Sequence, residues 1–350
     1  MRDRVLTVTT DISRRVTWLQ QLVPGLLIAW VIALASQFIS EHYGAPAMLL
    51  ALLFGISLNF IGDHPECSEG VSFGARSVLR LGVALLGLRI SFDMIWTLGW
   101  PVVGLVVAMV PLTIAFGLIV SQFFGFKFRF AFLSAGAVAI CGASAAIAIA
   151  AILPKDAKSE DRLVFTVVGV TLLSTFAMIT YPMFSQYVGF NDQTAGIYLG
   201  ATIHDVAQVV GAGFSISPEA GETATLVKLL RVAMLAPVIV VVSLLLRGRT
   251  DPATDIERPP VIPVFVLGFL ALATLNSAMV LPEVLLTFVA TGSQWLLLTA
   301  IAAVGLKTKP AEVLKVGRAA AGLLVVETLF LAVFVAVALS VLPLDVTSTH

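Results

Sequence analysis

The sequence predicts an all-α membrane protein with about eleven transmembrane helices, some of them broken, and with inverted repeats. Three observations predict this fold class: the composition, the length of the apolar runs and an internal repeat. Of the 350 residues, 59% are hydrophobic and 12% are charged, and that charged share is about half that of a soluble domain. One soluble core could not bury this much apolar surface. The composition therefore excludes a soluble enzyme, a nucleic-acid-binding protein and a disordered scaffold, and the lipid bilayer is the expected environment.

Eleven apolar segments approach the roughly 20 residues that a helix needs to cross the hydrocarbon core. They lie at about 20–39, 46–61, 74–90, 97–120, 130–153, 162–184, 194–213, 224–246, 261–280, 284–306 and 319–342. The first follows several arginines and has no clear small-residue cleavage site, so we interpret it as a membrane helix and not as a signal peptide. No long polar segment separates any two of the eleven. We therefore expect a single transmembrane domain, residues 1–350, with short loops.

The basic residues predict how the chain is oriented in the membrane. With the N-terminus inside, fifteen of the 21 basic residues fall on the inner side: Arg2, Arg4, Arg14, Arg15, Arg76, Arg80, Lys127, Arg129, Arg247, Arg249, Arg258, Lys307, Lys309, Lys315 and Arg318. The other six are Arg89, Lys155, Lys158, Arg162, Lys228 and Arg231. Because inner loops are enriched in Lys and Arg, this distribution predicts an inside N-terminus and an outside C-terminus.

Two parts of the chain, about 46–120 and 263–342, resemble each other. The matching positions include Pro46 with Pro263, Asn59 with Asn276, and Gly87-Leu88-Arg89 with Gly305-Leu306-Lys307. Chance similarity between Leu- and Gly-rich helices is the alternative, but paired Pro, Asn and cationic positions are uncommon inside spans. Equivalent helices are separated by an odd number of spans, so the two copies are expected in opposite orientations. Inverted repeats are typical of carriers that expose one site alternately to each side of the membrane.

The predicted span 194–213 carries the densest polar group within the apolar segments. His204 and Gln208 are one helical turn apart, and Asp205 lies next to His204. Polar side chains inside a span are costly unless they face a cavity or a partner. We predict that His204 and Gln208 bind the substrate and that Asp205 is a coupling or gating acid. A polar cluster that only fixes helix packing is the alternative.

The predicted span 130–153 contains a run of small residues around Cys141, Gly142, Ala143 and Ser144. Small residues either allow close helix packing or let a helix unwind at mid-membrane, where it lines a cavity. If the helix restarts at 142–144, its free N–H groups and its positive dipole end favour an anion. We therefore predict that these four residues contribute to the substrate site.

Four further polar residues are assigned supporting roles. Asn59 and Asn276 are predicted to form hydrogen bonds between helices or at broken helix ends. Arg89 and Lys307 lie at helix ends, where they are expected to anchor the chain at the interface or to attract anions.

Three charged residues within or near spans have no partner that the sequence identifies. Lys228 and Arg231 begin the predicted span 224–246 and are expected on the outer side, where they would raise the local anion concentration. Glu327 lies near the middle of the predicted span 319–342.

Motifs of enzymes and of ATP-driven pumps are missing from the sequence. The two cysteines, Cys67 and Cys141, are too few for a disulfide framework, and no Cys/His cluster has metal-site spacing. The phosphate-binding pattern Gly-x(4)-Gly-Lys-Ser/Thr is absent. We predict no enzymatic activity, no metal and no cofactor, with a proton or a sodium ion as the coupling ion. A membrane-embedded enzyme that uses His204 and Asp205 is the alternative.

These motifs resemble one bacterial family. The stretches 87–89, 140–145, 204–210 and 305–308, within a chain that is similar from Pro24 to the last span, resemble the YeiH-like sulfate exporters. The commoner family form has Glu after the histidine, so Asp205 is a conservative departure that keeps the carboxylate. The family is in turn similar to the sodium/proton antiporter and bile-acid symporter superfamily. That similarity implies two broken helices that cross at mid-membrane, and a core domain that moves against a panel domain.

The resemblance implies a secondary carrier that exports a small anion, sulfate or an organic sulfonate, by alternating access. The expected location is the bacterial inner membrane, with a cytoplasmic N-terminus and a periplasmic C-terminus. The expected partners are the lipid bilayer and the anion, with no nucleic acid, and a homo-oligomer is left open. Two alternatives are a cation-coupled importer of an organic carboxylate or sulfonate, and a membrane sensor or scaffold that transports nothing.

Overall fold

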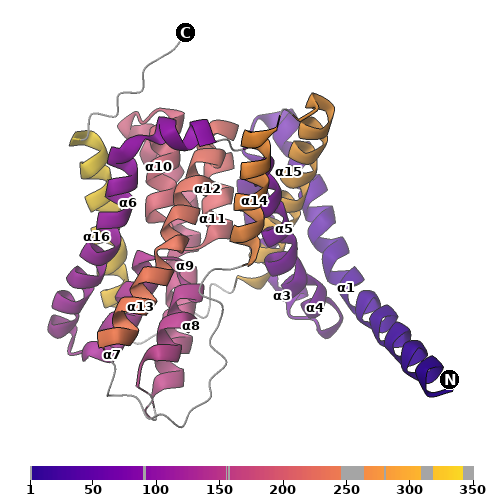
Figure 1. The fold of residues 1–350 in the computed structure, drawn as a ribbon, viewed down its shortest axis with the longest axis horizontal. Coiled ribbons are helices and arrows are strands. Elements are labelled where there is room, and N and C mark those ends of the chain that lie inside the picture. The colour runs from indigo at the N-terminus through magenta and orange to yellow at the C-terminus, as the bar shows by residue number, and fades with distance from the viewer. Residues whose placement is uncertain are drawn as a thin grey trace. The chain divides into compact units, whose positions relative to one another are not determined.

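The computed structural model describes residues 2–89, 92–154, 156, 158–245, 264–279, 281–308 and 318–341, and helices are the only regular secondary structure in these ranges (Figure 1). Side chains are described from Gln20 onward, outside 90–97. The chain divides into two compact units, one within 1–83 and 287–309 and the other within 84–286 and 310–350. The single transmembrane domain expected from the sequence stays a prediction. Several basic residues named above lie outside the described side chains: Arg2, Arg4, Arg14, Arg15, Lys155, Arg247, Arg249, Arg258, Lys309 and Lys315.

The first unit consists of the N-terminal helices and most of one helix from far along the chain. Its elements are α1 (Arg2–Tyr43), α2 (Ala47–Ser57), α3 (Asn59–Gly62), α4 (Pro65–Phe73), a π-helical turn (Gly74–Val78), most of α5 (Leu79–Leu86) and most of α15 (Glu283–Lys307). Helix α1 packs against α4. The rings of Trp30 and Trp295 lie 5.2 Å apart, and the Ser293 hydroxyl donates a 2.8 Å hydrogen bond to the Gly82 carbonyl. These contacts fasten α15 onto the N-terminal helices.

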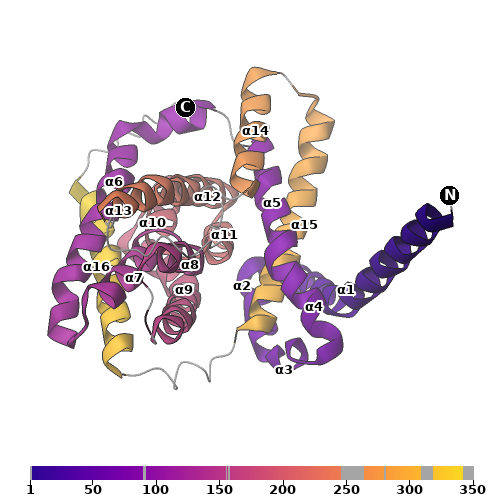
Figure 2. The same cartoon turned by 60° about the horizontal axis from the view of Figure 1, so that its bottom comes forward.

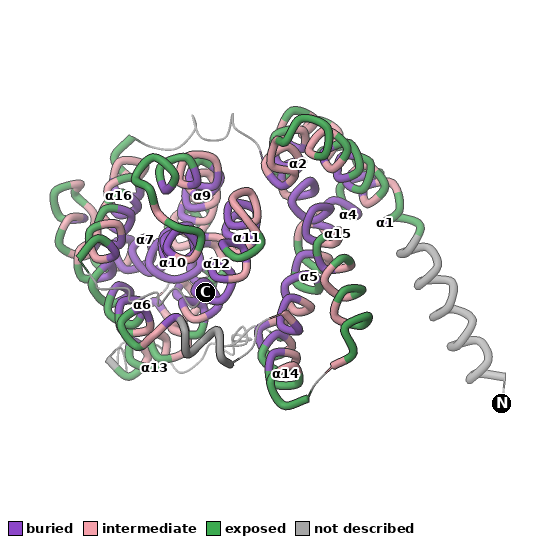
Figure 3. The backbone as a smooth tube through the Cα atoms, turned by 90° about the horizontal axis from the view of Figure 1, so that it is seen from above, coloured by how far each residue is buried: buried purple, intermediate pink, exposed green. Residues whose placement is uncertain are grey.

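The second unit contains the remaining helices. Its elements are the 3-10 turns Gly87–Arg89 and Ser121–Phe124 and the helices α6 (Phe92–Val120), α7 (Phe128–Ala139), α8 (Ala143–Ile152), α9 (Ser159–Val188), α10 (Asp192–Thr202), α11 (Val206–Phe214), α12 (Pro218–Ala233), α13 (Leu235–Leu245), α14 (Val264–Ala278) and α16 (Arg318–Val341). Figure 2 shows α7, α8, α10, α11 and α12 gathered in one group. In Figure 3, α7, α10 and α12 are mostly coloured as buried, so these helices form the core of the unit.

The structure does not confirm eleven spans. Among the described residues, seven helices are long and apolar enough to cross a membrane: Gln20–Tyr43, Pro65–Arg89, Leu98–Phe124, Ser159–Val188, Pro218–Leu244, Glu283–Lys307 and Arg318–Val341. The segments predicted at 46–61 and 261–280 form the shorter helices α2 and α14, of 11 and 15 residues. The segments predicted at 130–153 and 194–213 each form two short helices. A helix of 12 residues reaches about 18 Å, well short of the roughly 30 Å hydrocarbon core.

The segment 128–152 folds back on itself, which corrects the expectation of one broken span that crosses the membrane. A Cβ atom placed on Gly136, near the end of α7, would meet the Ile149 side chain, near the end of α8. At the open end of this pair, Arg129 in the first turn of α7 and Arg162 in the first turn of α9 both bind the Asp156 carboxylate. The two ends of the segment therefore lie together, and α7 and α8 form a helical hairpin.

The segment 192–214 folds back in the same way, as the directions of α10 and α11 relative to α12 show. Gly196 of α10 lies against Thr223, and Gly200 lies one turn further against Val227, so α10 runs parallel to α12. Gly213, at the end of α11, lies against Gly221 near the start of α12, so α11 runs antiparallel to α12. Helices α10 and α11 therefore form a second hairpin.

Helix α9 connects the two hairpins and runs past both tips. Phe165, in its first turns, contacts Phe130 of the first hairpin. Ser174, in its middle, binds the main chain of Asp205 at the tip of the second hairpin. Tyr181, closer to its end, contacts Tyr198 of α10. The hairpins thus approach the middle of α9 from its two opposite ends, as Figure 1 shows for α8 and α10.

Candidate functional site

The tips of the two hairpins meet inside the second unit. A Cβ atom placed on Gly142, at the first tip, would lie 3.5 Å from the Cβ of His204, at the second tip, and 3.5 Å from Val170 of α9. The Lys228 ammonium of α12 bridges the tips, because it donates hydrogen bonds of 2.9 Å to the carbonyls of both Ile140 and Ile203. The structure therefore brings together the two segments that the sequence marks as the substrate site.

Gly142 makes the first tip possible. Its φ of +62° and ψ of −123° lie where residues with a side chain are strained. Helix α8 begins at the next residue, and no side chain caps its N-terminus. Ser144 in this first turn is exposed, whereas Cys141 is buried. The N-terminus of α8 thus presents main-chain N–H groups and a positive dipole end at an accessible position.

The second tip carries the three polar residues that the sequence singles out. Asp205 caps α11 by accepting a 2.8 Å hydrogen bond from the Ala207 N–H, and it is half-buried. His204 is fully buried, and its Nε2 lies 2.9 Å from the Thr328 hydroxyl of α16. Gln208 is buried and donates to the Thr175 hydroxyl over 3.4 Å. His204 Nδ1 and Gln208 Oε1 are buried and have no hydrogen-bond partner within the described part of the chain.

Lys228 and Arg231 lie at the centre of the site, which corrects the expectation that they sit on the outer side. Both side chains are fully buried on α12. They donate hydrogen bonds of 2.9–3.3 Å to five main-chain carbonyls at the ends of α7 and α10: Val138, Ala139, Ile140, Gly200 and Ile203. The ends of these helices carry the negative ends of the helix dipoles and unpaired carbonyls. The two cations interact favourably with the negative dipole ends and also donate hydrogen bonds to the unpaired carbonyls. Because the carbonyls come from both hairpins, the cations link the two hairpins.

By formal charge, the ionisable side chains at the tips sum to a positive value. Lys228 and Arg231 belong to none of the ion pairs found for the described tips and their surroundings, which are Arg89–Glu222, Arg129–Asp156 and Arg162–Asp156. Asp205 is the one carboxylate at the tips, which leaves an excess of one positive charge. A buried charge without an ionic partner is costly. An anionic ligand at the tips would offset that cost.

A buried carboxyl group lies on the next helix. Glu327 of α16 is fully buried, and its Oε1 accepts a 2.9 Å hydrogen bond from the Ser134 hydroxyl of α7. Its Oε2 has no partner in the described part of the chain. A Cβ atom on Gly117 of α6 would overlap this carboxyl group. Thr328, the next residue, contacts His204, so Glu327 borders the site through α16.

The four residues assigned supporting roles lie elsewhere. Arg89 pairs with Glu222 of α12 at 2.5 Å, with both side chains only partly exposed. Asn276 is half-buried on α14. Asn59 begins α3 and Lys307 ends α15, both in the first unit. None of the contacts described here joins these four residues to the hairpin tips.

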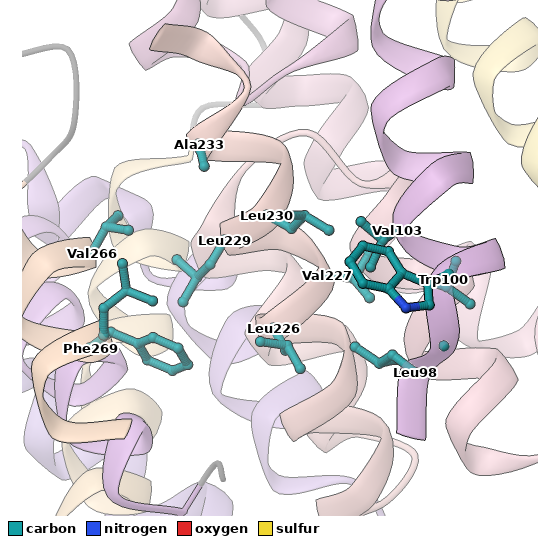
Figure 4. Close-up of a pocket in the computed structure, with 13 residues that line it drawn as sticks. Leu98, Trp100, Val103, Leu226, Val227, Leu229, Leu230, Ala233, Val266 and Phe269 are labelled. Atoms are coloured by element: carbon teal, nitrogen blue, oxygen red, sulfur yellow. The ribbon is translucent and has the colours of Figure 1, made fainter. Parts of the chain in front are cut away.

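One apolar cavity of the second unit is separate from the tips. It has a volume of about 330 Å³ and lies between α6, α12 and α14. Figure 4 shows Trp100 and Val103 on one side and Val266 and Phe269 on the other, with Leu230 between them. A lining of this kind suits an apolar chain and not a small anion. No group of three metal-ligating residues is found in the part of the chain that the structure describes.

Comparisons with known proteins match one membrane family over most of the chain. The family model described as conserved hypothetical protein 698 matches residues 24–324. The chain is 55% identical to the UPF0324 membrane protein TauZ of Paracoccus pantotrophus, over 93% of this chain and 96% of that protein. It is 53% identical to a UPF0324 membrane protein of Rhizobium meliloti, over 89% and 91%, and 47% identical to one of Chlorobaculum tepidum, over 89% and 87%. No solved structure matches.

Proposed function

The chain belongs to the conserved hypothetical protein 698 family of multi-pass bacterial membrane proteins, and on this premise we propose that it is a secondary carrier of a small anion. The proposed substrate is sulfate or an organic sulfonate, exported by alternating access. The substrate binds at the tips of the two hairpins, near Cys141–Ser144 and close to His204 and Gln208. Asp205 is the coupling or gating acid.

One observation carries this proposal: two hairpin tips meet around buried cations that no carboxylate pairs with. Helices α8 and α11 begin at the tips, so two positive dipole ends point at the same region. Lys228 and Arg231 add two charges to it. Carriers commonly bind anionic groups at the N-termini of half-helices near mid-membrane. The site therefore favours an anion over a neutral or cationic solute.

Two equivalent contacts support inverted repeats. Gly87 packs against the main chain of Phe269 and against Leu272. Its repeat partner, Gly305, packs against the main chain of Leu52 and against Gly55, the repeat partners of Phe269 and Leu272. Each copy of the motif thus packs on the helix that belongs to the other copy. A two-fold relation between inverted copies produces this exchange.

The hairpins also support a cytoplasmic N-terminus. Because 128–152 folds back, Lys158 and Arg162 lie on the same side as Lys127 and Arg129. In an arrangement in which α2 and α14 also cross the membrane, and with Lys228 and Arg231 buried in the core, Arg89 is the one basic side chain among those described that is left on the outer side. This distribution follows the enrichment of Lys and Arg in cytoplasmic loops more closely than the sequence alone indicates.

Thermal unfolding of the purified protein with anions tests the proposal. Three samples are compared: the unmodified chain, Ser144→Asp and Ser144→Asn. An acid in the first turn of α8 suits the helix dipole and keeps the hairpin stable, but its charge repels an anionic ligand. Asn is the matched neutral control. Sulfate, methanesulfonate and chloride are added at equal ionic strength.

We expect sulfate or methanesulfonate, and not chloride, to raise the unfolding midpoint of the unmodified chain, since a ligand of the folded state stabilises it. The same rise is expected in Ser144→Asn, and none in Ser144→Asp. The proposal fails if neither oxyanion raises the midpoint, or if Ser144→Asp responds like the unmodified chain.

A further inference from the structure

The Lys228 ammonium occupies a position that resembles a cation site. Its Nζ donates at 2.9 Å to the Ile140 carbonyl and at 2.9 Å to the Ile203 carbonyl. Both carbonyls lie at the C-terminal end of a half-helix, one from each hairpin. In carriers with broken helices, the C-terminal ends and unwound carbonyls of half-helices are the groups that coordinate a coupling sodium ion.

We infer that Lys228 is a built-in replacement for a bound sodium ion, so that the anion site of this carrier forms without sodium. The inference deepens the proposed function, and it rests on that proposal in taking the protein to be an anion carrier. A free ion would have to bind before each transport cycle to join the hairpins. A tethered ammonium is always present, and it supplies the same charge to the same two carbonyls.

The surroundings of Lys228 leave no room for a free cation as well. Its side chain is fully buried. Arg231, one turn further along α12, also binds the Ile203 carbonyl, at 2.9 Å, and reaches the carbonyls of Val138 and Ala139 at 2.9 and 3.0 Å. A sodium ion here would face two fixed positive charges, with carbonyls that are already hydrogen-bonded. Both electrostatics and hydrogen bonding therefore oppose sodium binding between the hairpin ends.

The inference predicts that removing the ammonium creates a cation site. Lys228→Ala leaves the Ile140 and Ile203 carbonyls without their shared donor and opens space between them. Lys228→Met is the matched control, because its side chain fills the space without a charge. Thermal unfolding is measured in choline, sodium, potassium and ammonium chloride at equal ionic strength.

We expect the unmodified chain to have the same midpoint in all four salts. Lys228→Ala is expected to have a lower midpoint in choline chloride and to recover part of the loss in sodium or ammonium chloride. Lys228→Met is expected to show no such recovery. A specific rise with sodium in the unmodified chain overturns the inference. So does the absence of any recovery in Lys228→Ala, or an equal recovery in Lys228→Met.

Two further measurements keep the outcomes separate. If Lys228→Ala does not fold, the inference is tested by comparing the unfolding midpoints of the unmodified chain in sodium chloride and in choline chloride. Sulfate is also titrated into the unmodified chain in choline chloride. A sulfate-induced rise without sodium supports the inference, and a rise that requires sodium overturns it. If no oxyanion acts in any salt, the carrier proposal fails, while the response of the variants to cations still tests whether Lys228 occupies a cation site.

Discussion

Gly142 reverses the chain at the first hairpin tip and starts α8 in one step. Its positive φ is a conformation that residues with a Cβ adopt at a cost of about 1–3 kcal/mol. The space around it is ordinary, with the closest side chains at 3.5 Å from a Cβ atom placed there. The requirement for glycine at this tip is therefore conformational and not one of close packing.

Gly142→Ala is expected to lower the unfolding free energy by about 1–3 kcal/mol because of this backbone strain. The measurement is the thermal unfolding midpoint of the purified protein. Gly104→Ala is the matched control: Gly104 lies within α6 and has nothing within 4 Å of an added Cβ, so alanine is expected to leave stability unchanged or to raise it by about 0.5–1 kcal/mol. Equal midpoints for Gly142→Ala and the unmodified chain would contradict the account.

Asp156 joins the two ends of the first hairpin outside the membrane-spanning helices. It binds Arg129 at 2.6 Å and also binds Arg162. The Arg162 guanidinium, together with the Lys158 N–H, holds the pKa of Asp156 well below its usual range. A carboxyl group with a lowered pKa stabilises the fold above its unfolded pKa, about 3.9, and loses that contribution as the pH falls through its folded pKa.

Asp156→Asn is therefore expected to lower the unfolding midpoint by an amount that stays constant between about pH 5 and pH 8 and shrinks below about pH 4. Midpoints of the two proteins measured across this range check the prediction. A difference that changes between pH 5 and pH 8 would show that another group is responsible.

At the scale of helices, the main finding is that two apolar segments, 128–152 and 192–214, fold back on themselves. The segment 130–153 is apolar throughout, and hydropathy is the same for one crossing helix and for a hairpin of two half-length helices. The run of small residues around Cys141 indicates a break, and the structure has one there. The direction of the chain after the break depends on contacts such as Gly136 with Ile149, which no local pattern reveals.

Single cysteines distinguish the two arrangements. Lys127→Cys and Lys158→Cys flank the first hairpin, and both positions are exposed. We expect a membrane-impermeant maleimide to label both from the same side of the membrane, and Asp192→Cys, at the start of α10, from the opposite side. The native Cys67 and Cys141 are buried, so the unmodified chain gives the background. Labelling of positions 127 and 158 from opposite sides would show that the segment between them crosses the membrane, and would contradict the hairpin.

The roles of Lys228 and Arg231 show where prediction from sequence ends. Their spacing of three residues places them on one face of a helix, and no acidic residue lies between them or directly beside them in an apolar segment. That pattern is a signal for two buried cations. Their acceptors, however, are main-chain carbonyls at the ends of α7 and α10, from residues up to 93 positions away in the chain. Every residue has a main-chain carbonyl, so the sequence does not show which carbonyls accept these hydrogen bonds. The charge of the site was therefore visible in the sequence, but its position was not.

For the whole molecule, the sequence predicts the class well and the topology less well. The membrane environment and helical architecture follow from composition, and the structure and the relatives agree with them. Gly142 and His204, from the two segments that the sequence marks as the substrate site, do come together. Eleven crossing helices are not confirmed, because two of the eleven apolar segments, 130–153 and 194–213, each fold back as two short helices.

The central claim, that this protein carries a small anion at the hairpin tips, is tested most directly by charge movement on a solid-supported membrane. Proteoliposomes of the unmodified chain, Ser144→Asp and Ser144→Asn are exposed to rapid jumps of sulfate and methanesulfonate. We expect saturable currents for the unmodified chain and for Ser144→Asn with at least one of these anions, and none for Ser144→Asp. No anion-dependent current in the unmodified chain, or an undiminished current in Ser144→Asp, would contradict the account.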